Sequence, residues 1–114
     1  MEVYFNILLE RARMVREWRR YMSRIADSIK KILPDARIYI FGSVIRGEAV
    51  GGSDVDILVV SKNMPESNIE RAKLKRKIEE LSNLPMHHPF ELHLASEEEA
   101  EWYFTRVKEM IEYK

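Results

Sequence analysis

Residues 41–60 read FGSVIRGEAVGGSDVDILVV. The stretch begins at the end of one apolar, β-forming run and finishes in another, and between them lie all four glycines of the chain. Apolar runs of this length that are bounded by glycine are typical of strands. We therefore expect strands at 37–41 and 55–60, joined by an irregular connection in which Gly42 lets the backbone approach a ligand closely.

The residues before this stretch predict one long helix at about 4–33. Bulky side chains recur there every three or four residues and form one stripe, which Arg11 alone interrupts and Pro34 ends. The members of the stripe are Tyr4, Leu8, Val15, Trp18, Met22, Ile25 and Ile29. Roughly 28 helical residues would measure about 42 Å, which is long for so small a domain. The stripe therefore covers the protein's own sheet or, in part, contacts another chain.

The residues after this stretch predict a helix at 67–81, a third strand at 90–95 and a last helix that opens with a capping box of Ser96 and Glu99. The inward positions of the first of these helices are predicted to be Ile69, Leu74, Ile78 and Leu81. The apolar positions of the last helix are predicted to be Trp102, Tyr103, Val107, Met110 and Ile111. Helices and strands therefore alternate along the chain.

A chain of 114 residues fits one domain, which we place at 1–114. Its 19 basic and 19 acidic side chains cancel, so the total charge gives no support to wholesale binding of a polyanion. The charge is uneven, because residues 1–33 hold eight basic and four acidic side chains while residues 90–114 hold three and seven. The absence of cysteine excludes a disulfide framework, a thiolate zinc site and a cysteine nucleophile. No apolar run approaches the roughly 18 residues of a membrane span, and we expect a cytoplasmic protein.

Four residues of the 41–60 stretch carry groups suited to phosphate chemistry. Asp54 and Asp56 alternate, so a strand would direct both carboxylates to one face, about 6.6 Å apart along the backbone, where they can converge on divalent metal. Gly42 leaves room for phosphate, and the hydroxyl and neighbouring N–H groups of Ser43 can bind its oxygens. Singly, Ser43 is better explained as a helix N-cap and the aspartates as turn residues. Together these explanations weaken, because unpaired acids entering a buried strand are costly.

The pattern Gly42-Ser43, ten residues, Asp54-x-Asp56 resembles the signature of the DNA polymerase beta-type nucleotidyltransferases, specifically the minimal nucleotidyltransferases of archaea and bacteria. The resemblance implies an α/β or α+β fold with a small mixed sheet of three or four strands flanked by helices. It also implies that Gly42 and Ser43 hold a nucleoside triphosphate and that Asp54 and Asp56 bind two Mg²⁺ ions. The third carboxylate of such sites would be Glu91, where the commonest form has aspartate.

Other polar residues leave alternatives open. Arg46 is either a phosphate contact or the surface partner of Glu48. His93 shares a strand face with Glu91 and could act as a base, a ligand or a phosphate contact, or simply pack against a helix. The neighbouring histidines at 87–88 point apart in an extended chain, which disfavours a metal site there. The basic run at 71–77 indicates a solvated helix face more than a nucleic-acid surface.

By resemblance, the chain would transfer AMP from ATP to a hydroxyl, with Asp54, Asp56 and Glu91 as the catalytic and metal-binding residues and Gly42, Ser43 and Arg46 as the nucleotide-binding ones. A chain this short has no region to select the acceptor, so a protein partner is expected. The resemblance implies a HEPN-domain toxin, with this protein as the antitoxin that adenylylates a toxin tyrosine. The alternative is an antitoxin that acts by stoichiometric binding. A homo-oligomer is left open, and neither a membrane nor a nucleic-acid partner is expected.

Overall fold

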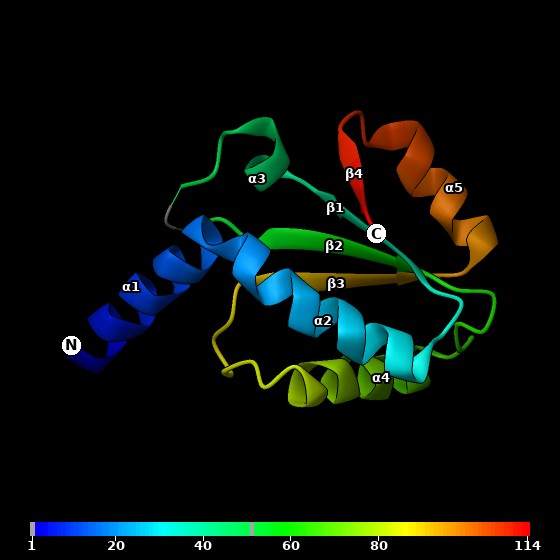
Figure 1. Cartoon of the computed structure of the whole chain (residues 1–114), viewed down its shortest axis with the longest axis horizontal. Coiled ribbons are helices and arrows are strands. Elements are labelled where there is room, and N and C mark those ends of the chain that lie inside the picture. The colour runs from blue at the N-terminus through cyan, green and yellow to red at the C-terminus, as the bar shows by residue number, and fades with distance from the viewer. Residues whose placement is uncertain (1, 51) are drawn as a thin grey trace.

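The computed structural model describes residues 2–50 and 52–114, and its secondary structure alternates between helices and strands (Figure 1). In chain order the elements are α1 (Glu2–Arg16), α2 (Trp18–Ile32), β1 (Arg37–Phe41), α3 (Ser43–Arg46), β2 (Val55–Val60), α4 (Asn68–Leu81), β3 (Phe90–Ala95), α5 (Glu97–Arg106) and β4 (Met110–Tyr113).

The four strands form one mixed sheet in the order β3-β2-β1-β4. β1 pairs antiparallel with both β2 and β4, whereas β2 and β3 run parallel. The strands predicted at 37–41, 55–60 and 90–95 are confirmed with these bounds. The predicted fold class, a small mixed sheet flanked by helices, is also confirmed.

Side-chain alternation along the strands builds a core on each face of the sheet. Ile38 and Ile57 point into the larger core, which is covered by α2 and α4. Tyr39 and Leu58 point into the smaller core, which is covered by α5 (Figure 1). Because successive strand residues face opposite sides, any polar residue that alternates with the larger core must lie on the α5 side.

The single helix predicted for residues 4–33 is wrong, because the structure contains two helices separated at Glu17. The Glu17 backbone, with φ −103° and ψ 27°, leaves the helical region. From Val15 onward the predicted stripe is buried in the protein's own core. The first half of α1 projects beyond the sheet (Figure 1), and its stripe residues Tyr4 and Leu8 are 65% and 43% exposed.

The last helix is shorter than predicted, since it ends at Arg106 and residues 110–113 form β4 instead. These residues pair with β1, so its edge gains a ladder of backbone hydrogen bonds that a longer helix could not provide. Met110 packs against the smaller core from its strand position. The capping box of Ser96 and Glu99 is confirmed.

The inward face predicted for α4 is partly wrong. Leu74 and Ile78 are buried, but Ile69 is 70% exposed and Leu81 is 49% exposed. Leu74 lies five positions after Ile69, which is about 140° around a helix, so the two cannot share a narrow buried stripe. Within the described parts of the chain, no helix has the length and apolar character needed to cross a bilayer.

Candidate functional site

The ends of three neighbouring strands meet at one edge of the sheet. Phe41, the last residue of β1, lies opposite Asp56 on β2 and Met110 on β4. Gly42, the Asp54-x-Asp56 pair and the turn at 107–109 are therefore adjacent. They surround a cavity of about 580 Å³. The residues lining it are Phe41, Gly42, Ser43, Arg46, Asp54, Asp56, Arg106, Val107, Lys108 and Glu109.

Gly42 is required by its backbone conformation and by its neighbour. Its φ of 90° and ψ of −161° belong to a region that only glycine adopts readily. A Cβ atom here would overlap Oδ2 of Asp56 and lie 3.2 Å from its Cγ. The glycine therefore lets the Asp56 carboxylate lie directly against the backbone at the end of β1.

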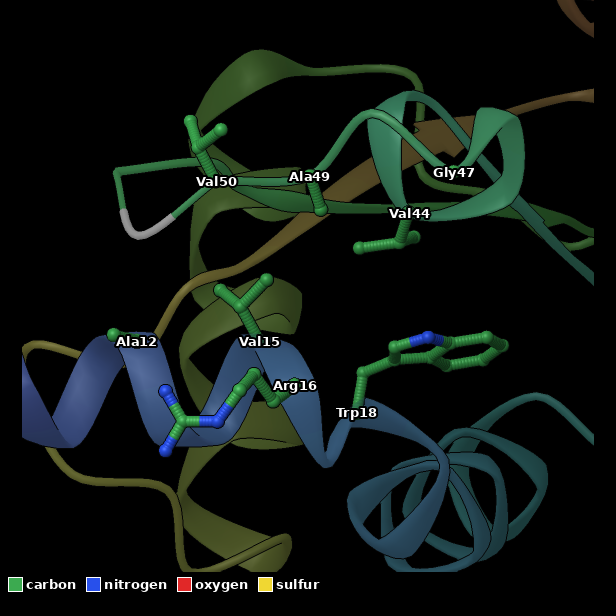
Figure 2. Close-up of a pocket in the computed structure, with 8 residues that line it drawn as sticks. All are labelled: Ala12, Val15, Arg16, Trp18, Val44, Gly47, Ala49 and Val50. Carbon is green, nitrogen blue, oxygen red and sulfur yellow. The ribbon is translucent and has the colours of Figure 1, made fainter.

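The short helix α3 presents different side chains on its two sides. Ser43 and Arg46 line the cavity, whereas Val44 faces Val15 and Trp18 across an apolar groove between α3 and the junction of α1 and α2 (Figure 2). The apolar packing of Val44 thus orients Ser43 toward the strand ends. Arg46 lines the cavity, as a phosphate contact would. It is also the surface partner of Glu48, since its Nε donates to Oε1 of Glu48 at 2.6 Å.

Asp56, Glu91 and His93 converge on the α5 side of the sheet. Asp56 lies opposite Glu91 in the parallel pairing of β2 and β3, and ligand atoms of the three residues lie within 4.8 Å of one another. His93 Nε2 is 3.0 Å from Oδ1 of Asp56. The other ring nitrogen of His93, Nδ1, is 3.5 Å from the Tyr103 hydroxyl. Two carboxylates and an imidazole at this spacing fit a divalent cation, and His93 also orients Asp56.

Asp54 lies at the rim of the site and contacts α1. Nη2 of Arg11 donates to Oδ1 of Asp54 at 2.8 Å, while Nη1 donates to the backbone carbonyls of His87 and His88 at 2.9 and 3.0 Å. Asp54 lines both the 580 Å³ cavity and a smaller one of about 260 Å³ on the Glu91 side. It is therefore placed between the cavities but outside the cluster formed by Asp56, Glu91 and His93.

Comparison with known proteins identifies the family. Residues 22–113 match the family model described as "Nucleotidyltransferase domain". The chain belongs to this family. A 41-residue segment of this nucleotidyltransferase domain, 36% of the chain, is 54% identical to a Methanocaldococcus jannaschii protein named "Putative protein adenylyltransferase". That segment spans only 28% of the relative's length.

Two solved structures are similar to this nucleotidyltransferase domain. One, described as a "putative nucleotidyltransferase", has a TM-score of 0.66 and 28% identity over 82% of this chain and 97% of its own. Another, described in the same words and from Sulfolobus solfataricus, has a TM-score of 0.61 and 24% identity over 94% of this chain and 86% of its own, and it supports the fold alone.

The candidate site includes residues that the sequence did not indicate. Arg106 and Lys108 line the cavity only because β4 follows them, and β4 was not predicted. The contact between Arg11 and Asp54 joins residues that are far apart in the chain. The one sequence signal for Arg11 was that a charged residue interrupted an otherwise apolar stripe.

The histidines at 87–88 contact two different carboxylates. Nε2 of His88 lies 2.5 Å from Oε2 of Glu79, and Nε2 of His87 lies 3.3 Å from Oε2 of Glu10. Three of the cations in the basic run at 71–77 form ion pairs with acidic residues. These pairs are Arg71 with Glu99, Lys73 with Glu70 and Arg76 with Glu80.

Proposed function

We propose that the protein transfers a nucleoside monophosphate, AMP from ATP, to a hydroxyl group with release of pyrophosphate. The observation that carries the proposal is the position of Asp56, which clusters with Glu91 and His93 and also lines, with Gly42 and Ser43, a cavity large enough for a nucleotide. ATP as the donor rests on the sequence resemblance and on the adenylyltransferase name of the Methanocaldococcus relative.

In this mechanism the acceptor oxygen attacks the α-phosphorus of ATP. An oxygen–phosphorus bond forms, the bond between the α-phosphorus and the bridging oxygen breaks, and pyrophosphate leaves with the electron pair. Asp54, Asp56 and Glu91 would hold Mg²⁺, which supplies positive charge to offset the negative charge on the phosphates. Gly42 and Ser43 place the triphosphate, and Glu91 accepts the proton of the attacking hydroxyl.

The acceptor that we propose is a tyrosine of a HEPN-type toxin. The protein would then be the antitoxin of a two-protein system, active in the cytoplasm. Support comes from the exposed apolar half of α1, which offers a partner a docking surface.

Transfer of label from α-labelled and γ-labelled ATP tests this function. Incubation with Mg²⁺ and the protein encoded beside this one should label that protein from α-labelled ATP only. The Asp54→Asn, Asp56→Asn double variant should transfer no label, whereas Asp27→Asn, which changes an exposed carboxylate on α2, should behave as the wild type. Equal labelling by the double variant would contradict the proposal.

A second candidate is an antitoxin that neutralises its partner by binding without turnover. The ion pair between Arg11 and Asp54 favours it, because a carboxylate held by arginine is less available to a cation. This candidate predicts that the Asp54→Asn, Asp56→Asn variant neutralises the partner as well as the wild type does. Loss of neutralisation in the folded double variant would exclude it.

A further inference from the structure

The antiparallel pairing of β4 with β1 brings the 107–109 turn to the nucleotide cavity. Met110 lies opposite Phe41, and Gly42 follows Phe41 directly. The residues just before Met110 must therefore lie beside the backbone at Gly42. Arg106 and Lys108 consequently line the same cavity as Gly42 and Ser43, although more than 60 residues separate them in the chain.

The three cations of the cavity differ in how they are engaged. The Arg46 guanidinium is bound to Glu48, and this hydrogen bond is the main cause of the raised pKa of Arg46. In the described part of the chain, neither Lys108 nor Arg106 forms an ion pair. The Arg106 guanidinium lies over the Trp102 ring, 4.8 Å from its centroid. Two exposed cations at the cavity wall are thus available to a ligand.

We infer that Arg106 and Lys108 bind the β- and γ-phosphates of the nucleotide, the part that leaves as pyrophosphate. The inference rests on the proposed function, and it assigns the leaving group to the turn before β4. Negative charge develops on the leaving group as the bond to the α-phosphorus breaks. Two positive side chains placed there stabilise that charge. A guanidinium and an ammonium are also the side chains most suited to phosphate oxygens.

The arrangement predicts selectivity for triphosphates over monophosphates. AMP lacks the two phosphates that these cations contact, so only ATP gains from them. Glu109 lines the same cavity and brings a negative charge close to the same phosphates. Removal of its charge should act in the opposite direction to removal of either cation.

Isothermal titration of the full chain with ATP and with AMP, both in Mg²⁺, tests the inference. We expect Lys108→Ala and Arg106→Ala each to weaken ATP binding about tenfold, the loss of one charge-assisted contact, and to leave AMP binding within about twofold of the wild type. Lys108→Arg should restore ATP binding, and Glu109→Gln should strengthen it. The control is Lys77→Ala, an exposed lysine on α4 outside the cavity, which should match the wild type.

Several outcomes would overturn the inference. These are equal losses for ATP and AMP, no loss relative to Lys77→Ala, or a wild type that binds neither ATP nor inorganic tripolyphosphate. Arg106 and Lys108 are both exposed, so their variants should fold, and thermal unfolding checks this directly. Label transfer is measured separately. Selective ATP binding that depends on Lys108, without any label transfer, would reject the proposed function and keep this inference. Label transfer with ATP binding that is independent of both Arg106 and Lys108 would reject this inference and keep the proposed function.

Discussion

Replacement of Gly42 by alanine should damage both the stability of the protein and its proposed metal site. The substitution places a Cβ atom where it overlaps Oδ2 of Asp56. It also forces a residue with a side chain into a backbone conformation, φ 90° and ψ −161°, that only glycine adopts readily. The two effects have separate physical causes, so other glycines of the loop can tell them apart.

The expected magnitude follows from these two causes. The backbone conformation costs about 1–3 kcal/mol for a residue other than glycine. Displacement of Asp56 breaks its 3.0 Å contact with His93, and a hydrogen bond to a charged group contributes about 1.5–3 kcal/mol. The free energy of unfolding should therefore fall by about 2.5–6 kcal/mol, the sum of the two costs. That is a large share of the about 5–15 kcal/mol typical of a domain.

Gly47 and Gly52 provide matched controls. Gly47 has φ 73° and ψ 21°, and a Cβ atom there meets nothing within 4 Å. Gly47→Ala should therefore cost only the left-handed conformation, about 1–2 kcal/mol. A Cβ atom at Gly52 also meets nothing within 4 Å, and its φ is not positive, so Gly52→Ala should be neutral or stabilise by up to about 1 kcal/mol.

Urea unfolding followed by circular dichroism gives the free energies, and Mn²⁺ titration followed by electron paramagnetic resonance gives the metal affinity. Gly42→Ala should lose about tenfold or more in Mn²⁺ affinity because Asp56 is displaced, while both controls keep the wild-type affinity. The reasoning fails if Gly42→Ala has the same free energy of unfolding as Gly47→Ala and binds Mn²⁺ as tightly as the wild type. In that case the contact between Gly42 and Asp56 does not constrain the site.

Three further predictions concern stability and are measured by urea unfolding. Arg11→Ala should lower the free energy of unfolding by about 1–3 kcal/mol, because three acceptors lose their donor, and an unchanged midpoint would contradict this. Arg71 holds the pKa of Glu99 at about 2, below its ordinary 4.5. The contribution of the Glu99 carboxylate to the stability of the fold is therefore complete above pH 4.5 and is lost as the pH falls toward 2. Glu99→Gln should therefore cost roughly 1 kcal/mol at neutral pH, after allowance for the exposure of the pair, and the difference should disappear in acid; a constant difference would refute the assignment. Ile78→Ala should cost about 2–5 kcal/mol and Ile69→Ala less than about 0.5 kcal/mol, and equal costs would contradict the observed face of α4.

The sequence predicted three strands because each one is a short β-forming run with a clear boundary. Gly42 ends β1, and Pro89 immediately precedes β3. The alternation within these runs also placed Glu91 and His93 on one face, which the convergence with Asp56 confirms. The local sequence was sufficient to predict these strands and their faces. The pairing of β2 with β3 then brings Asp56 close to Glu91 and His93.

The features that the sequence did not reveal depend on contacts between distant segments. No glycine or proline lies at Glu17 or after Arg106, so nothing local marked the break between α1 and α2 or the end of α5. β4 exists because β1 offers an unpaired edge, which is a property of the folded sheet. The turn cations and the partner of Asp54 were missed for the same reason.

Arg11 makes the position of α1 and the state of Asp54 thermodynamically dependent on each other. The first half of α1 lies outside the segment that matches the family, and its exposed apolar residues are Val3, Tyr4, Phe5, Leu8 and Leu9. A protein that binds there and shifts α1 changes the free energy of the ion pair with Asp54. If binding of that protein changes the affinity of Asp54 for a cation by some factor, then a cation bound at Asp54 changes the affinity of α1 for the protein by the same factor. One side chain thus links the rim of the candidate site to a surface at the far end of a helix.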